Sequence, residues 1–179
     1  MRVIAGSLGG RRLKAPRGRA TRPTSDRVRE ALFAMLGELD GANVLDLFAG
    51  SGALGIEALS RGAGHVVFVE RDPVALGVMR ENLAALGIGA AASVRRADAL
   101  AALQSARERQ EKYDLVFIDP PYKQAHALTP ELSAALPPLL EHAARVVVES
   151  DRRSPLELPF ELQRSRTYGD TLITIHRHP

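Results

Sequence analysis

The sequence contains no cysteine, and this absence excludes disulfide bonds, zinc ribbons and thiol catalysis. It also lacks tryptophan and has only five phenylalanines and three tyrosines, which excludes a surface that stacks many nucleobases. The longest weakly polar run, residues 83–94, is shorter than the roughly 20 apolar residues of a membrane span. No apolar segment of the signal-peptide type follows Arg2. We therefore expect a cytoplasmic, globular, monomeric protein without bound metal or membrane contact.

Acidic residues are nearly absent from the first 29 positions. This stretch has nine arginines and lysines and one acid, Asp26. The remaining residues have fifteen arginines and lysines and twenty acids. A basic segment on a mildly acidic body is typical of a protein that holds a polyanion at one end. A solvated surface segment in an arginine-rich sequence is the alternative. The predicted nucleic-acid contacts are Arg2, Arg11, Arg12, Lys14, Arg17, Arg19 and Arg22.

Short apolar runs alternate with helical stretches through most of the chain. Continuous apolar strands separated by helices are typical of a parallel sheet that is covered on both faces. Residues 162–167 and 172–176 flank a turn and predict an antiparallel hairpin at the end of the chain. The other predicted strands are residues 44–48, 66–70, 93–97, 115–118 and 146–149, and the predicted helices are residues 26–39, 53–60, 73–86, 100–111 and 129–142.

The amino-terminal residues 1–23 are predicted to form a small arm and linker before a main domain of residues 24–179. Residues 2–6 and 11–15 are extended candidates around a Ser-Leu-Gly-Gly turn, a pattern that resembles a β-hairpin. The following stretch is rich in proline, glycine and arginine, as linkers often are. Ser25 then predicts the N-cap of the first helix.

The first strand of the main domain ends in a glycine-rich turn. In an open α/β sheet, ligands bind beyond the carboxyl ends of the strands, so a cofactor is expected there. The spacing of Gly50, Gly52 and Gly55, with Glu70 at the end of the next strand, fits the dinucleotide fingerprint. Asp46 in the strand favours the ammonium of a methionine moiety over a pyrophosphate. A hydrogen bond from Asp46 to its own loop is the alternative.

The ends of the second and third strands offer further candidates. Asp98 follows the third strand at the same edge and could accept a hydrogen bond from an adenine amino group. Capping of the next helix by Asp98 is an equal alternative. Arg71 and Ala99, directly beside Glu70 and Asp98, are predicted cofactor contacts as well.

The sequence Asp119-Pro120-Pro121-Tyr122 follows the apolar strand at residues 115–118. Two consecutive prolines fix φ and remove two backbone donors, which leaves carbonyls that point outward from a rigid loop. A carboxylate and a carbonyl can take both hydrogens of a planar amino group while the aromatic ring stacks on its heterocycle. The nitrogen lone pair then faces an incoming methyl group. Asp119, Pro120 and Tyr122 are therefore the predicted catalytic residues, and a plain turn after a strand is the alternative.

Taken in order, these motifs resemble those of S-adenosylmethionine-dependent amino-methyltransferases. Residues 22–30 (RPTSDRVRE) and 47–62 (LFAGSGALGIEALSRG) closely resemble the RsmD family, and the resemblance spans nearly the whole chain. It implies a Rossmann-like class I methyltransferase fold, an α/β fold with a mostly parallel seven-stranded sheet. It also implies methyl transfer from S-adenosyl-L-methionine to the exocyclic N2 of one guanine in small-subunit (16S) ribosomal RNA. The substrate implied is a partly assembled small subunit.

The resemblance assigns roles to the predicted site residues. Asp46, Gly50 and Gly52 would frame the methionine part of the cofactor, and Glu70 would bind the ribose hydroxyls. Thr24 and Arg27 lie where related methyltransferases contact the cofactor carboxylate, although RNA contact or helix capping fits these two equally. The full set of cofactor contacts implied is Asp46, Phe48, Gly50, Gly52, Glu70, Arg71, Asp98, Ala99, Thr24 and Arg27.

Three other functional classes use part of this pattern. A DNA amino-methyltransferase, acting on adenine N6 or cytosine N4, uses similar chemistry but normally carries a sizeable target-recognition region. A nicotinamide oxidoreductase fits the glycine loop and leaves Asp46 and residues 119–122 unexplained. A non-catalytic RNA chaperone fits the basic segment alone.

Overall fold

One sheet of seven strands organises the computed structural model, which describes residues 1–16 and 25–179, and only the backbone at residues 122–124 and 126. The strand order is β3-β2-β1-β4-β5-β7-β6, and only β7 runs antiparallel to the rest. This confirms the predicted α/β, Rossmann-like, mostly parallel sheet with a carboxyl-terminal antiparallel hairpin. The strands are β1 Asn43–Asp46, β2 His65–Glu70, β3 Ala92–Arg96, β4 Tyr113–Ile118, β5 Leu140–Asp151, β6 Glu161–Tyr168 and β7 Thr171–Arg177.

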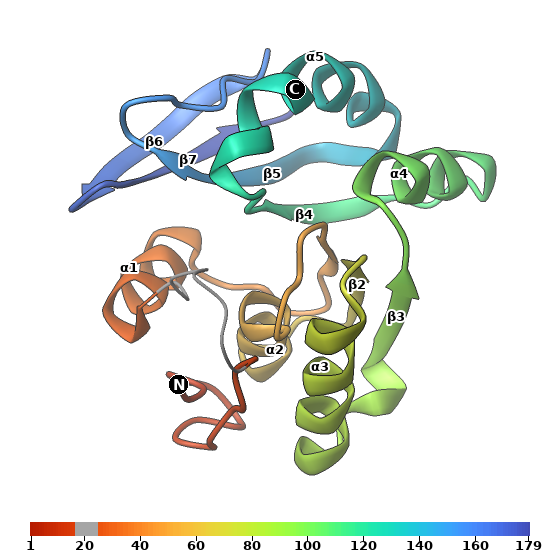
Figure 1. The fold of residues 1–179 in the computed structure, drawn as a ribbon, viewed down its shortest axis with the longest axis vertical. Coiled ribbons are helices and arrows are strands. Elements are labelled where there is room, and N and C mark those ends of the chain that lie inside the picture. The colour runs from red at the N-terminus through yellow and green to blue at the C-terminus, as the bar shows by residue number, and fades with distance from the viewer. Residues whose placement is uncertain (17–24) are drawn as a thin grey trace.

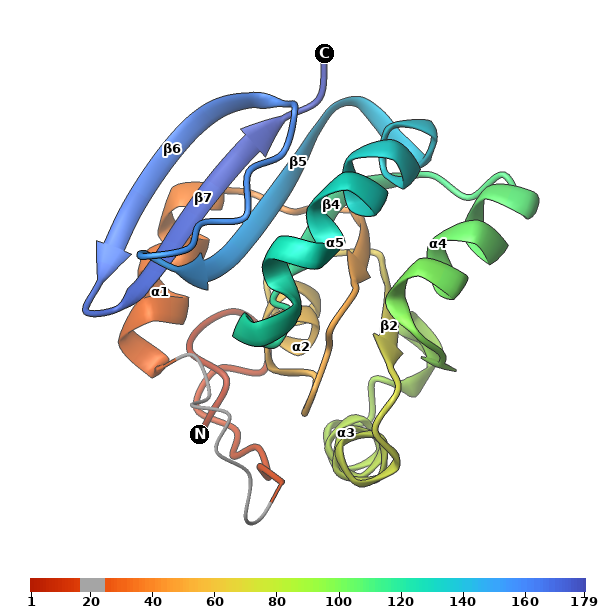
Figure 2. The same cartoon turned by 45° about the horizontal axis from the view of Figure 1, so that its top comes forward.

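Helices cover both faces of this sheet (Figure 1). α4 and α5 lie on one face, and α1, α2 and α3 lie on the other (Figures 1 and 2). Each face has its own cluster of buried apolar side chains, so the central strands β1, β2, β4 and β5 are apolar on both sides, as is typical of a parallel sheet. Within the described ranges, no helix is long and apolar enough to cross a membrane. The helices are α1 Asp26–Leu36, α2 Ala53–Ser60, α3 Pro73–Leu86, α4 Ala99–Glu108 and α5 Tyr122–Ala135, with 3-10 turns at Gly89–Ala91 and Pro137–Leu139.

Local signals in the sequence set most helix ends. Ser25 caps α1, because its hydroxyl accepts a hydrogen bond from the Val28 N–H at 3.3 Å. α1 ends at Leu36, three residues before the predicted end, where Gly37 provides the C-cap. α2 and α3 have the predicted bounds. Asp72 caps α3 by accepting from the Ala75 N–H at 2.8 Å.

The prediction of a helix at residues 129–142 is wrong. α5 begins seven residues earlier, directly after the two prolines at positions 120 and 121, and it contains Pro130. Two further prolines at 137 and 138 end the helix and form the 3-10 turn, because a proline cannot donate the next helical hydrogen bond. Residues from Leu140 onward therefore belong to β5, which is much longer than the apolar run that predicted it.

The amino-terminal segment packs against the body on the same side as α1, α2 and α3 (Figures 1 and 2). Its two extended pieces pair antiparallel through one bridge, between Arg2 and Arg12, with a hydrogen bond from the Val3 N–H to the Arg11 carbonyl at 2.9 Å. Val3 and Leu13 are buried in the cluster that also contains α2. The predicted boundary at residue 23 lies outside the described residues.

Buried side chains of α2 hold the backbone of this arm, defined here as residues 1–14. The Glu57 side chain is 0% exposed and accepts hydrogen bonds from the Ile4 N–H at 2.7 Å and the Ala5 N–H at 3.1 Å. The Ser60 hydroxyl donates to the Ala5 carbonyl at 2.5 Å. A Cβ atom on Gly6 would lie 1.8 Å from the Ser60 carbonyl oxygen, so only glycine fits at this contact. The arm therefore has a fixed place on α2.

Close packing of α2 on β2 gives a test of the fold. A Cβ atom on Gly55 would lie 2.3 Å from Cε1 of the buried Phe68 ring. We expect Gly55→Ala to lower the free energy of unfolding by about 1–3 kcal/mol, because the core around the ring must shift. Gly77→Ala on α3 is the matched control, since its Cβ would meet no atom within 4 Å. It should raise stability by about 0.5–1 kcal/mol, measured by urea unfolding. Equal effects of the two substitutions would contradict this packing.

Candidate functional site

The predicted site residues come from the carboxyl ends of neighbouring strands. Asp46 is the last residue of β1 and lies in register between Phe68 of β2 and Phe117 of β4. Glu70 ends β2, and Asp119 directly follows β4. The parallel register thus brings three acidic residues, distant in the chain, to one edge of the sheet.

Asp46 is buried and bonded to the loop that follows it. Its side chain is 2% exposed, and its Oδ2 accepts a hydrogen bond from the Gly55 N–H at 3.0 Å. Burial raises the pKa of Asp46 from an ordinary value near 3.8 to about 7, and the charge of Glu70 adds to the rise, while the Gly55 bond opposes it. The hydrogen bond to its own loop, which the sequence left open as an alternative, is present.

The glycine turn between β1 and α2 leaves open space beside its backbone. Gly52 adopts φ 83° at the N-cap of α2, a conformation that glycine adopts without strain. A Cβ atom on Gly50 would meet no atom within 4 Å, so a ligand can approach this backbone closely. Phe48, two residues before Gly50, is half-buried.

Glu70 holds this turn from the neighbouring strand. Its Oε2 accepts from the Gly50 N–H at 2.9 Å, and its Oε1 accepts from the Asp72 N–H at 2.7 Å. Each carboxylate oxygen has a second lone-pair site, so both can accept a further hydrogen bond from a hydroxyl group. The position and chemistry of Glu70 therefore fit a ribose.

Asp98 caps α4 and also lies at the predicted edge. Its Oδ1 accepts from the Leu100 N–H at 3.1 Å, and its Oδ2 lies 3.6 Å from Nη1 of Arg71. Both side chains are more than half exposed, while Ala99 is buried. Asp98 can therefore cap α4 and still accept a hydrogen bond from a ligand at the carboxyl edge of the sheet, because its side chain stays accessible to solvent.

The loop after β4 starts with the half-buried carboxylate of Asp119. Burial, the charge of Glu149 and the charge of Asp46 all raise the pKa of Asp119 well above its ordinary value. Pro120 is buried, and Pro121 is exposed at the N-cap of α5. Tyr122 is the first residue of α5, and the position of its side chain lies outside the described residues.

Several predicted contacts of the amino-terminal region can be located. Arg2 lies 3.6 Å from Asp26, and Lys14 Nζ lies 2.8 Å from Glu81, both on the exposed surface. Arg11 and Arg12 are exposed and form no ion pair within the described residues. Arg27 is exposed in the first turn of α1. Arg17, Arg19, Arg22 and Thr24 lie outside the described residues.

Two buried charged residues near these elements were not predicted from the sequence. Glu149 lies close to the carboxyl end of β5, and its position directly after three consecutive valines was the available signal. Arg29 on α1 is completely buried and donates to the Arg2 carbonyl at 2.6 Å and to Asp26 Oδ1 at 2.7 Å. Arg29 belongs to the basic segment of residues 1–29, and nothing in that pattern predicts its burial.

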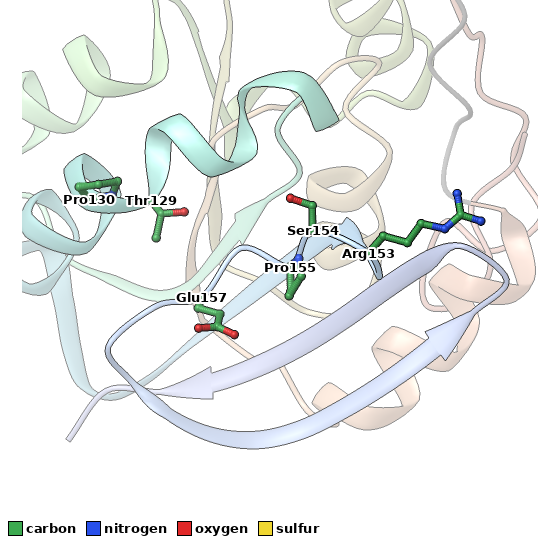
Figure 3. Close-up of a pocket in the computed structure, with 6 residues that line it drawn as sticks. All are labelled: Thr129, Pro130, Arg153, Ser154, Pro155 and Glu157. Atoms are coloured by element: carbon green, nitrogen blue, oxygen red, sulfur yellow. The ribbon is translucent and has the colours of Figure 1, made fainter.

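A groove of about 560 Å³ lies between α5 and the chain that follows β5 (Figure 3). In this view the Ser154 hydroxyl points toward α5, and the Arg153 side chain extends away from it (Figure 3). None of the predicted site residues lines this groove, so we do not assign the site there. Its lining residues are Thr129, Pro130, Arg153, Ser154, Pro155 and Glu157.

The burial of Asp46 predicts a specific pH dependence of stability. With a folded pKa near 7, Asp46 keeps its proton in the folded protein while the unfolded chain ionises near pH 4. Its contribution to stability therefore falls as pH rises from about 4 to about 7. We expect Asp46→Asn to gain stability relative to the natural protein over this window, by an amount on the order of a few kcal/mol, and to level off above pH 8. Urea unfolding at several pH values measures this difference, and a pH-independent difference would contradict it.

Comparisons with known proteins support the motif-based family assignment. The family model described as Conserved hypothetical protein 95 matches residues 1–177. Ribosomal RNA small subunit methyltransferase D of Haemophilus influenzae is 35% identical over 94% of this chain and 89% of its own. YlbH of Bacillus subtilis is 44% identical over 99% of this chain and 98% of its own.

The fold agrees with these matches. The solved structure of yhhF from Escherichia coli is similar to this chain with a TM-score of 0.85 and 34% identity, over 99% of this chain and 97% of that one. Sequence, fold and motifs thus point to one family. The chain belongs to the RsmD family of S-adenosylmethionine-dependent ribosomal RNA methyltransferases.

Proposed function

We propose that this protein transfers a methyl group from S-adenosylmethionine to the exocyclic N2 of a guanine in small-subunit (16S) ribosomal RNA. The observation that carries the proposal is the position of Asp119 and Pro120. They follow β4 at the carboxyl edge, directly beside the β1 end that carries Asp46 and leads into the glycine turn. An acceptor pair for an amino group therefore lies next to a candidate cofactor site.

The residues around the glycine turn fit S-adenosylmethionine. When bound, this cofactor supplies a methyl group on a positively charged sulfur. The Asp46 carboxylate, with Gly50 and Gly52, suits the methionine part, and Glu70 suits the ribose hydroxyls. Asp98, with Arg71 and Ala99 beside it, lies where the adenine would be bound, and Phe48 flanks the turn. Thr24 and Arg27 stay proposed contacts of the cofactor carboxylate.

Asp119 and Pro120 would orient the target amine. The Asp119 carboxylate accepts one N–H of the amino group, and the Pro120 carbonyl accepts the other. The Tyr122 ring is proposed to stack on the base. Because its pKa is raised, Asp119 takes up a proton more readily than an exposed aspartate does. It is therefore suited to receive the proton that leaves nitrogen after transfer.

Guanine N2 reaches this loop only if the base is unstacked, so the target is a loop nucleotide or a flipped base. The arm offers Arg2, Arg11, Arg12 and Lys14 for the RNA phosphates, and Arg17, Arg19 and Arg22 are proposed to extend this set. Val3 and Leu13 anchor the arm in the core, so the charges of Arg2, Arg11, Arg12 and Lys14 are presented from a fixed support. The partly assembled small subunit is the proposed substrate, and the protein is proposed to act as a monomer.

Substitution of Asp119 tests the catalytic proposal. We expect Asp119→Ala to reduce the rate of methyl transfer on the order of 10²–10³-fold, because the preorganised charged acceptor is removed. The rate of Asp119→Asn should lie between those of Asp119→Ala and the natural protein, since its amide oxygen still accepts a hydrogen bond. Single-turnover methylation of small-subunit RNA and of partly assembled subunits, at saturating cofactor, measures these rates. Calorimetry with S-adenosylmethionine provides the control, and turnover of Asp119→Ala near the natural level would refute the assignment.

Neutralising arm arginines tests RNA binding without disturbing the core. Arg11→Gln with Arg12→Gln removes two exposed charges, whereas deleting the arm would also remove Val3 and Leu13 from the core. The slope of log K against log salt should decrease by about 0.7–0.9 for each RNA phosphate that is no longer neutralised, with cofactor affinity unchanged. Arg107→Gln with Arg177→Gln is the matched control, because both residues are exposed near the amino edge of the sheet. Identical slopes for all three proteins would exclude Arg11 and Arg12 from the RNA interface.

A further inference from the structure

Glu149 of β5 stands beside the proposed catalytic carboxylate. The parallel register of β4 and β5 pairs Phe117 with Val147 and Ile118 with Val148. The next positions along the two strands are Asp119 and Glu149. The influence of the Glu149 charge on the pKa of Asp119 agrees with this close approach.

The two carboxylates also share one face of the sheet. Phe117 and Val147 belong to the apolar cluster under α1 and α2, whereas Ile118 and Val148 belong to the cluster under α4 and α5. Because side chains alternate along a strand, Asp119 and Glu149 lie on the side of Phe117 and Val147. Asp46, opposite Phe117 in register, lies on that side as well.

The proposed target presents a matching edge. Guanine carries an N1–H directly beside its N2 amino group, so its Watson–Crick edge offers donors at both positions. In the proposed site, Asp119 and Pro120 take the two hydrogens of N2, and the N1–H still requires an acceptor. An ionised carboxylate accepts hydrogen bonds and donates none. Glu149 is 7% exposed and lies on β5, the strand next to β4, whose end carries Asp119.

We propose that Glu149 accepts the N1–H of the target guanine and so makes the site select guanine among purines. This inference rests on the proposed guanine-N2 function. Adenine and 2-aminopurine carry a lone pair at N1, which would face the carboxylate lone pairs in the same position. A site built for a donor rejects a base that lacks it, because the acceptor in the protein loses its partner.

The test replaces the target guanine by 2-aminopurine in small-subunit RNA that is reconstituted into the partly assembled subunit, the proposed substrate. 2-Aminopurine keeps the N2 amino group and lacks both the N1–H and the O6 oxygen, so the change of preference in Glu149→Gln is the readout for the N1 contact. We expect the natural protein to prefer guanine by about 100-fold or more in kcat/KM. Glu149→Gln should narrow this preference at least tenfold, because the glutamine amide can donate to the N1 lone pair of 2-aminopurine. Asp119→Asn should lower transfer to both bases together.

The ratio of kcat/KM for guanine to that for 2-aminopurine distinguishes base recognition by Glu149 from a structural role. A merely structural Glu149 would lower both rates equally on substitution, and an unchanged ratio in Glu149→Gln would overturn the inference. Glu141→Gln, at the exposed start of the same strand, is the matched control and should leave both rates unchanged. Equal use of guanine and 2-aminopurine by the natural protein would overturn the inference even if Glu149→Gln failed to fold. Absence of transfer to guanine would instead overturn the proposed function.

Discussion

The hydrogen-bonding register of β1, β4 and β5 determines where the acidic residues of the site stand. Each strand has an apolar run that ends in, or is followed by, a carboxylate on the same face of the sheet. A shift of one residue in any strand would turn its acid toward α4 and α5 instead. The apolar clusters on both faces resist such a shift, so the core fixes the geometry of the site.

This arrangement has a cost in stability. Asp46 is buried and Asp119 is half-buried, and the charge of a neighbouring acid raises the pKa of each. A chain under no functional constraint would place apolar side chains at the ends of such strands, because burying like charges together is unfavourable. The clustering of perturbed carboxylates at the edge where ligands bind in open α/β sheets is therefore an argument for function.

Much of the fold could be predicted from the sequence because its signals are local. Strand-like runs bounded by glycine, proline and capping residues locate the first five strands, and the turn at residues 168–170 locates the last two. The predicted bounds of α2 and α3 are correct. The prediction misplaces α5 because Pro130, a residue typical of a helix start, lies inside this helix. The full length of β5 depends on pairing with its neighbouring strands, and no local sequence pattern shows where it begins and ends.

The site residues that belong to a sequence motif could be predicted. The charged residues that are buried by tertiary contacts could not. Asp46, Glu70 and Asp119 follow recognisable strand ends, and all three lie at the predicted edge. The burial of Arg29 results from its contact with the Arg2 carbonyl, which no spacing in the sequence reveals. The same holds for Glu57, whose hydrogen bonds reach residues more than 50 positions away.

One buried amide on α3 joins two segments with different proposed ligands. Asn82 accepts from the Lys14 N–H at 2.8 Å, donates to the Lys14 carbonyl at 3.1 Å, and also donates to the Ser51 carbonyl in the glycine turn at 3.1 Å. Displacement of the arm would therefore disturb the same side chain that donates to the turn beside the proposed cofactor site. Thermodynamic linkage makes such a connection reciprocal: if binding of RNA changes the affinity for the cofactor by some factor, the cofactor changes the affinity for RNA by the same factor.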